Sequence, residues 1–178
     1  MKHTLLFLLM ICACTLQATA TGKQPRLTDD ELMTLVQKQT FRYFWDFAHP
    51  ESGLARERSN DRLEIATIGG SGFGVMAIIV GVERGFITRE QGAERLLKIV
   101  EFLNKADSYH GIWAHWMDGA TGKTIPFSRK DDGADLVESA FMFEGLLAAH
   151  QYFTHDNPTE NRIRGLINTP VSYTHLRA

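Results

Sequence analysis

The chain has 178 residues, of which 44% are hydrophobic and 22% charged, and its formal net charge is −2 at pH 7. This length and composition suit about one domain with a packed core. The near-neutral charge gives no basic field to attract nucleic acid or an anionic membrane, so we expect neither as a partner.

Residues 1–20 have the pattern of an export signal. A weakly basic start is followed by the apolar run Leu5–Leu16, which is too short to span a membrane, and by the small-x-small site Ala18–Ala20. An alternative is the lipobox-like sequence Ile11–Cys14, which would leave Cys14 as a lipid anchor. Either alternative predicts an exported protein that is periplasmic, secreted or anchored to the outer membrane. Both cysteines lie in this segment, so the rest of the chain has no thiol nucleophile.

Hydrophobic periodicity predicts an all-α chain. Capping boxes at Thr28–Glu31 and Thr88–Gln91 mark the starts of two helices, and His49-Pro50 ends the first of them. The predicted helices cover about residues 29–48, 71–82, 88–106, 133–153 and 159–167.

The helices alternate in character. Those at 71–82 and 133–153 are apolar nearly all round and are expected to be buried, whereas 29–48 and 88–106 are amphipathic. Long loops precede both apolar helices, so an antiparallel arrangement places these loops at one end, where the N-termini of the buried helices point. An α/α toroid is built in this way, although short helical arrays give the same pattern.

Asp135 and Glu138 are three residues apart at the start of an apolar helix, and therefore share one face. Buried carboxylates need basic partners or a wet cleft, which favours a functional site. The alternative is N-terminal capping by Asp131, Asp132 and Asp135, which explains Asp132 well and Glu138 poorly. Because a helix N-terminus stabilises the ionised carboxylate, this pair need not be a complete acid/base couple, and one member could act with a carboxylate elsewhere.

The two long loops carry further candidates for substrate binding. Trp113, His115 and Trp116 lie in the second loop, where an exposed indole would offer a flat face to a sugar ring. Arg56 and Arg58, in the first loop, could face the carboxylates or bind sugar hydroxyls. The alternatives are that both tryptophans pack under the loop and that both arginines are solvated surface charges.

Two nucleotide-binding patterns lack their context. Gly72–Ala77 matches G-x-G-x-x-A, but no second strand follows the helix that it opens. Gly122–Thr124 resembles the end of a P-loop without the required first glycine. The seven histidines include no convincing metal-ligand spacing. We therefore expect no cofactor and no metal.

Four segments in order carry a family resemblance. The chain resembles the glycoamylase-like proteins of Bacteroidetes and related bacteria, which include endo-β-1,2-glucanases. The resemblance implies an (α/α)6 toroid, secretion or lipid anchoring, and metal-free hydrolysis of a glucan with inversion. It places Asp135 and Glu138 at the family's D-x-x-E position in the cleft and implies a further essential glutamate later in the sequence. The matching segments are residues 39–47, 53–59, 69–74 and 115–138.

The resemblance also implies a domain organisation. Residues 28–168 would be the N-terminal part of the catalytic domain, about the first half of a toroid, whereas residues 169–178 match nothing in the family and are expected to be a non-native tail. Ala134 stands where relatives often have glycine. A half toroid would expose apolar faces of its inner helices, so we expect this chain by itself to be inactive.

The sequence therefore predicts a glycoside hydrolase that cleaves a glucan, with β-1,2-glucan as the leading substrate. One alternative is a glucoamylase-type enzyme acting on α-glucan, and another is a non-catalytic glycan-binding lipoprotein.

Overall fold

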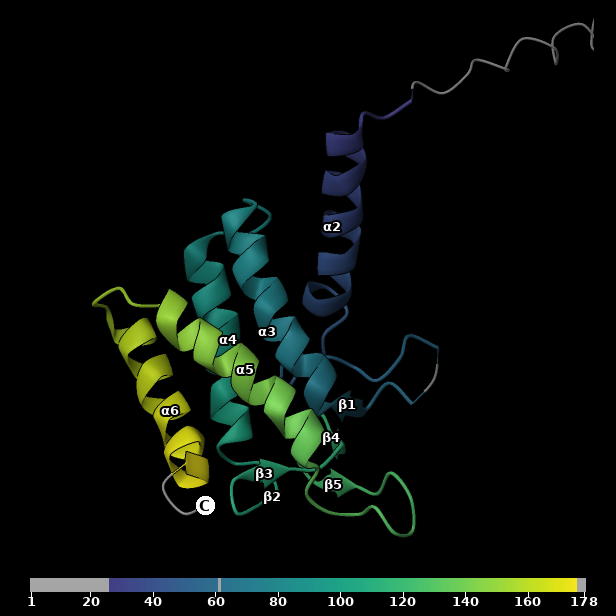
Figure 1. Cartoon of the computed structure of the whole chain (residues 1–178), viewed down its shortest axis with the longest axis vertical. Coiled ribbons are helices and arrows are strands. Elements are labelled where there is room, and N and C mark those ends of the chain that lie inside the picture. The colour runs from purple at the N-terminus through teal and green to yellow at the C-terminus, as the bar shows by residue number, and fades with distance from the viewer. Residues whose placement is uncertain (1–25, 61, 176–178) are drawn as a thin grey trace, which may run out of the picture. The chain divides into compact units, whose positions relative to one another are not determined.

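The computed structural model describes residues 26–60 and 62–175, with side chains through residue 170 (Figure 1). The predicted signal peptide and the lipid-anchor alternative at Cys14 lie outside the described residues. The chain divides after Thr34 into two units, each described by itself. The described part is mostly helical, as predicted, and none of its helices is long and apolar enough to cross a membrane. The helices are α2 (Asp29–Trp45), α3 (Ile68–Glu83), α4 (Arg89–Leu103), α5 (Leu136–Tyr152) and α6 (Pro158–His175).

Both predicted capping boxes are confirmed. The Thr28 backbone N–H donates to Glu31 Oε2 at 2.8 Å, and the Glu31 N–H donates back to Thr28 Oγ1 at 3.3 Å. At the start of α4, Thr88 and Gln91 make the same reciprocal pair at 2.9 and 3.2 Å. Each box satisfies two backbone N–H groups that a helix leaves without internal partners.

Several helix boundaries differ from the prediction. Helix α3 begins at Ile68, directly after a strand, and α5 begins at Leu136 instead of near Gly133. Helix α6 continues through Pro170 to His175, beyond the predicted end at Ile167 and into the segment that we expected to be a non-native tail. A proline inside a helix removes one backbone hydrogen bond, and here the helix continues past that loss.

The two long loops contain short strands, so the described chain is mostly helical and not all-α as predicted. In the first sheet, β4 (Trp116–Asp118) pairs antiparallel with both β1 (Ile65–Thr67) and β5 (Thr124–Ile125). A separate hairpin joins β2 (Ser108–Tyr109) to β3 (Ile112–Trp113). Strands of two or three residues are too short for their alternation to be read from sequence. The β1–β4 pairing fastens the two loops together.

Helices α3 and α5 run side by side in the same direction, with their N-terminal ends at the strands, and α4 and α6 run the opposite way (Figure 1). Glycines allow the backbones of α3 and α5 to touch. A Cβ atom on Gly72 would lie 2.7 Å from the Met142 backbone nitrogen, and one on Gly145 would lie 3.2 Å from the Gly72 carbonyl carbon. The N-termini of α3 and α5 lie at the strands of the two long loops, so they point to the long-loop end, as predicted.

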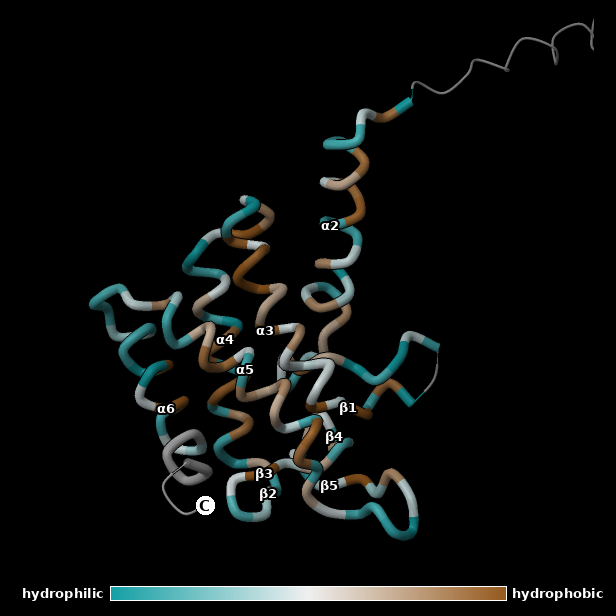
Figure 2. Tube along the Cα trace, viewed as in Figure 1, coloured by the Kyte–Doolittle hydropathy of each residue, from teal (hydrophilic) through white to brown (hydrophobic). Residues whose placement is uncertain are grey.

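One apolar face of this helix pair is uncovered in the described part of the chain. On α3 the Phe73 side chain is 55% exposed, and Met76 and Val80 also face solvent. Phe141 and Leu147 continue the exposed apolar surface on α5, and the rings of Phe73 and Phe141 lie 5.2 Å apart. Figure 2 shows hydrophobic residues along both helices. The prediction that α3 and α5 are buried nearly all round is therefore correct only for the sides on which they pack on each other and on which α3 packs on α4 and α5 on α6.

Candidate functional site

The carboxylate of Glu138 lies between the N-terminal ends of α3 and α5. Its Oε2 atom accepts a hydrogen bond of 2.8 Å from the Gly69 backbone N–H and a longer one of 3.4 Å from the Thr67 hydroxyl. Thr67 is the N-cap residue of α3, but its side chain makes no capping hydrogen bond. Glu138 therefore supplies, from α5, an acceptor for the first turn of α3.

Asp135 is the N-cap residue of α5 itself. Its Oδ1 atom accepts hydrogen bonds from the backbone N–H groups of Val137 at 2.9 Å and Glu138 at 3.0 Å. The Asp135 N–H donates to the Trp113 carbonyl oxygen at 2.8 Å, which ties the start of α5 to β3. The capping alternative is therefore correct for Asp135 and wrong for Asp132, because the helix begins three residues further along the chain than predicted.

His115 holds the other oxygen of Asp135. Its Nδ1 atom lies 3.1 Å from Asp135 Oδ2, and its ring is packed against Phe127, with 4.3 Å between ring centroids. Burial opposes ionisation of Asp135, but hydrogen bonds from the Glu138 amide, the His115 ring and the Val137 amide outweigh it and hold the pKa of Asp135 below its usual range. This carboxylate is suited to act as a base or to hold substrate, and not to donate a proton.

A third carboxylate, that of Glu57, reaches the neighbouring strand. Its Oε2 atom accepts a 3.0 Å hydrogen bond from the Trp116 indole N–H, and Trp116 pairs in register with Thr67. Burial, followed by the nearby charge of Glu57, raises the pKa of Tyr43. Sequence reasoning missed Glu57, because a glutamate between two arginines in a loop carries no periodic signal. Its charged neighbours were visible in sequence, but its contact with Trp116 was not.

The two tryptophans predicted to bind sugar are not exposed as that role was expected to require. Trp113 is 2% exposed and lies in the core, where its indole N–H faces the Leu103 carbonyl oxygen at 3.3 Å. The alternative that this ring packs under the loop is therefore correct for Trp113. Trp116 is also mostly buried, although the Arg62 guanidinium lies over its ring at 5.2 Å from the centroid.

The two predicted arginines serve the first loop. Arg56 donates from Nε to the Phe47 carbonyl at 3.0 Å and from Nη1 to the Leu63 carbonyl at 2.8 Å. Arg58 pairs with Glu57 at 3.0 Å and is half exposed. Neither has a hydrogen bond or ion pair to Asp135 or Glu138 among the described contacts, so Arg56 braces the loop and Arg58 remains near the surface.

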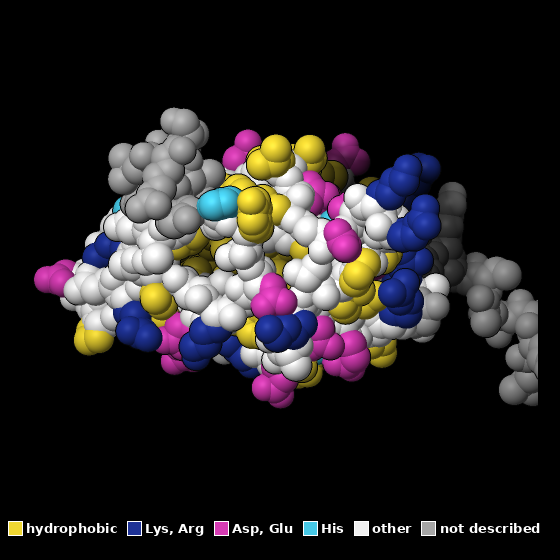
Figure 3. Space-filling view, turned by 90° about the horizontal axis from the view of Figure 1, so that it is seen from below, with side chains coloured by type: hydrophobic (Ala, Val, Ile, Leu, Met, Phe, Trp, Pro, Cys, Tyr) yellow, Lys and Arg dark blue, Asp and Glu magenta, His cyan; other side chains and the backbone are white. Residues whose placement is uncertain are grey.

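Figure 3 looks onto this end of the molecule from below. Basic side chains gather at the right-hand edge of the face, with acidic side chains beside them. Among the described residues, no group of three or more His, Cys, Asp or Glu side chains could hold a metal ion.

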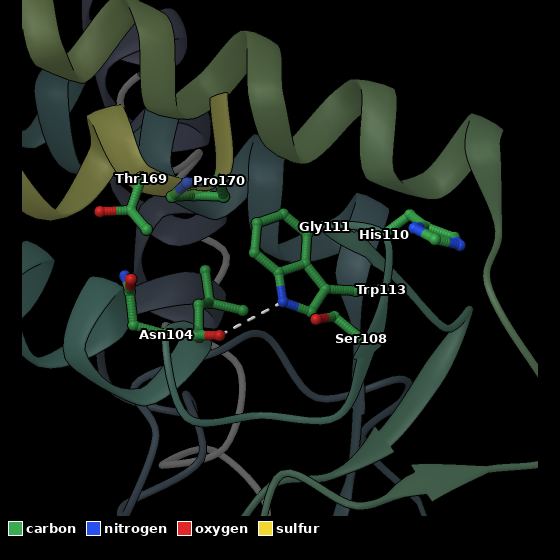
Figure 4. A pocket seen from close by; sticks show the side chains of 8 residues that line it. Asn104, Ser108, His110, Gly111, Trp113, Thr169 and Pro170 are labelled. Carbon is green, nitrogen blue, oxygen red and sulfur yellow. Dashed lines mark hydrogen bonds between the residues drawn. The ribbon is translucent and has the colours of Figure 1, made fainter. Parts of the chain in front are cut away.

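A separate open pocket of about 330 Å³ lies beside the β2–β3 hairpin (Figure 4). Its walls come from the end of α4, the hairpin and α6, and they include Asn104, His110 and Thr169. Neither Asp135 nor Glu138 lines this pocket. The candidate site is therefore the region around Asp135 and Glu138, because these carboxylates are the acidic groups with defined hydrogen-bond partners.

The arrangement is that of a helical domain in which the paired helices α3 and α5 hold carboxylates at their N-terminal ends. Glycoside hydrolases use two carboxyl groups that flank the scissile bond, one as an acid and the other as a base or nucleophile. Asp135 and Glu138 provide acidic groups with defined partners and partial access to solvent. The fold and the site together therefore agree with a carbohydrate-cleaving helical domain.

Comparisons with known proteins agree with this class. No protein-family model matches the chain. Over 143 residues, 80% of this chain, it is 53% identical to an exo β-1,2-glucooligosaccharide sophorohydrolase (non-reducing end) of Parabacteroides distasonis. The chain spans 20% of that relative's length.

Solved structures give the same result. A glucoamylase-like protein of Bacteroides uniformis is 81% identical, with a TM-score of 0.83 over 84% of this chain and 37% of its own. An endo-β-1,2-glucanase of Chitinophaga pinensis, in a complex with sophorotriose and glucose, is 50% identical, with a TM-score of 0.80 over 83% of this chain and 37% of its own. The homologues are therefore glucoamylase-like proteins of Bacteroidetes that include β-1,2-glucanases, and the resemblance expected from sequence is confirmed.

Proposed function

We propose that the chain is part of a glycoside hydrolase that cleaves β-1,2-glucan. The observation that carries this proposal is the placement of two carboxylates, Asp135 at the start of α5 and Glu138 against the start of α3. They lie in a chain whose homologues include β-1,2-glucanases. The whole protein's activity is inferred, since this chain spans 37% of the solved glucanase.

The proposed architecture is an incomplete α/α toroid. Helices α3 and α5 would be inner helices and α4 and α6 outer ones, because neighbouring helices in the sequence alternate in direction. The uncovered face that includes Phe73 and Phe141 supports this proposal. Further inner helices of a whole toroid would cover it and remove exposed apolar surface from water.

In the proposed mechanism, the hydrolase inverts the configuration at the anomeric carbon. One carboxyl group protonates the leaving oxygen, and a carboxylate activates a water molecule on the opposite face of the sugar. The lowered pKa of Asp135 favours the ionised form, so Asp135 would hold substrate or assist as a base. Glu138 would act beside it, and the remaining carboxyl group would come from elsewhere in the whole protein.

We further propose that the protein is exported. This rests on the apolar run and the small-x-small site within residues 1–20, with a lipid anchor at Cys14 as the alternative. Radiolabelled palmitate tests the anchor, because incorporation that is lost in Cys14→Ser would establish it. Cleavage after Ala20 without labelling would establish the ordinary signal peptide.

A second candidate function is glucoamylase-type hydrolysis of an α-glucan. It is favoured by the 81% identity to the glucoamylase-like protein of Bacteroides uniformis. The β-1,2-glucan proposal is preferred because both the sophorohydrolase and the endo-glucanase relatives carry that linkage in their names.

The test is an assay of the whole protein on β-1,2-glucan, starch and laminarin. We expect β-1,2-linked oligosaccharides from the first substrate and no product from the others, with the initial anomer identified by proton NMR. Release of sugar from starch alone would reject the proposal in favour of the second candidate. Binding of β-1,2-glucan without any product would identify a glycan-binding protein.

A further inference from the structure

Gly69 makes the shorter of the two hydrogen bonds that the Glu138 carboxylate accepts from the start of α3. Its backbone N–H belongs to the first turn of α3 and donates to Glu138 Oε2 at 2.8 Å. No acidic residue lies in that first turn, so the acceptor comes from α5, 69 residues further along the chain. A hydrogen bond to a charged acceptor is short and directional, so it fixes the position of that oxygen.

The absence of a side chain at Gly69 makes room for this carboxylate. A Cβ atom on Gly69 would lie 2.9 Å from Glu138 Cδ, 3.2 Å from Oε1 and closer still to Oε2. These separations are shorter than van der Waals contact, so a methyl group and the carboxylate cannot both occupy their places. One of them must move.

Moving the two helices apart to make that room would cost packing along their whole contact. One turn further along α3, a Cβ atom on Gly72 would meet the backbone of Phe141 and Met142, which shows that α3 and α5 already touch backbone to backbone. A glutamate side chain has several rotatable bonds, and shifting it costs less than separating two packed helices. A methyl group at Gly69 would therefore displace the carboxylate and leave the helix pair in place.

From this geometry we infer that Gly69 is a positioning residue for the reaction at Glu138, aligning the carboxylate through its backbone N–H and through the space left by its missing side chain. This inference rests on the proposed function.

The test is Gly69→Ala in the whole protein. Misplacement of a catalytic group by about 1 Å can cost about 100-fold in rate, so we expect kcat on β-1,2-glucan to fall by about that factor. KM should change much less, because most sugar contacts are untouched. The melting temperature should stay near that of the wild type, because the helix propensity gained with alanine offsets the displaced hydrogen bond.

Two other glycines provide matched controls. A Cβ atom on Gly165, in α6, would meet nothing within 4 Å, so Gly165→Ala should leave kcat unchanged and raise the melting temperature slightly through the gain in helix propensity. Gly72→Ala would press a methyl group against backbone and should lower the melting temperature strongly. Of these three glycine variants, only Gly69→Ala should combine a large loss of kcat with an intact fold.

A second variant separates positioning from a general effect on structure. In a Glu138→Asp background the carboxylate is one methylene shorter and leaves room for a methyl group, so Gly69→Ala should cost much less kcat there than in the wild type. Equal losses in both backgrounds, or a wild-type kcat for Gly69→Ala, would overturn the inference. A whole wild-type protein that does not cleave β-1,2-glucan would instead reject the proposed function.

Discussion

Two carboxylates at helix N-termini, Asp135 and Glu160, have similar titration behaviour but very different surroundings. Asp135 caps α5, and its side chain, which is 18% exposed, faces a histidine. Glu160 lies in the first turn of α6, and its side chain, which is 3% exposed, binds the Arg89 guanidinium through both oxygens at 2.9 and 2.8 Å. Burial raises the pKa of each group, and hydrogen bonds outweigh that effect, so both pKa values are lowered.

The difference shows that a shifted pKa does not by itself identify a functional carboxylate. Glu160 also accepts the His155 backbone N–H at 2.8 Å, and the Arg89 guanidinium that binds it lies over the Tyr152 and Phe153 rings. Its bonding capacity is used within the protein, which is typical of a structural ion pair. Asp135 retains partial exposure, whereas Glu160 is almost fully enclosed, so Asp135 is the one of the two that a ligand can reach.

The largest expected effect is that of Glu138→Gln in the whole protein. The amide oxygen that this substitution introduces can still accept the Gly69 N–H, so we expect a normal melting temperature with turnover reduced by about a thousandfold. The control is Glu160→Gln, which should lower the melting temperature and leave kcat of the folded protein unchanged. Retained turnover in Glu138→Gln would remove Glu138 from the site.

The next effect concerns stability. Arg89→Met leaves the Glu160 charge buried without its main partner and should destabilise the protein by about 3 kcal/mol, measured by urea denaturation. Arg58→Met removes a half-exposed ion pair and should change stability by less than about 1 kcal/mol. Similar losses in the two variants would contradict the assignment of Glu160 as the structural member of the comparison.

A smaller effect separates capping from chemistry at Asp135. Asp135→Ala should cost about 1 kcal/mol through loss of the N-cap, whereas Asp135→Asn keeps a capping oxygen and should cost a few tenths. Both variants should lose turnover if the charge itself is needed. An active Asp135→Asn protein would make Asp135 a cap and nothing more.

The smallest effect is a change in the response to acid. Because the pKa of each carboxyl is lower in the folded protein, the unfolded chain binds more protons than the folded protein at low pH. The stability that each ionised carboxylate contributes is fully present above its ordinary pKa, 3.8 for Asp and 4.5 for Glu. It is lost as pH falls through the lower pKa of the folded protein. Melting temperature measured from pH 6 to pH 3 should therefore fall, and it should fall less steeply in Glu160→Gln. An unchanged slope in that variant would show that Glu160 does not contribute.

Local patterns in the sequence predicted the helices well. The boxes at Thr28 and Thr88 link residues three apart, so their geometry follows from the chain itself. The pair Asp135 and Glu138 was visible for the same reason, although its detailed contacts were not. Asp135 proved to be both the cap and a candidate site residue, two roles that the sequence pattern had presented as alternatives.

Contacts between residues far apart in the sequence could not be predicted from local sequence patterns. Nothing near Gly69 in the chain indicates that it faces Glu138, and nothing near Glu57 indicates its hydrogen bond to Trp116. Trp113 and Trp116 are three residues apart in one loop, yet the indole N–H of the first faces the Leu103 carbonyl in the core and that of the second binds the Glu57 carboxylate. Their separation depends on strand register, which a two-residue strand does not reveal.

The pairing of β1 with β4 also has a consequence for the order of folding. Thr67 meets Trp116, and Gly69 meets Glu138, so each half of the candidate site waits for a partner that is synthesised much later. Such contacts close large loops and therefore form slowly compared with the helices. We expect the helices to form early and the carboxylates to reach their final positions among the last events.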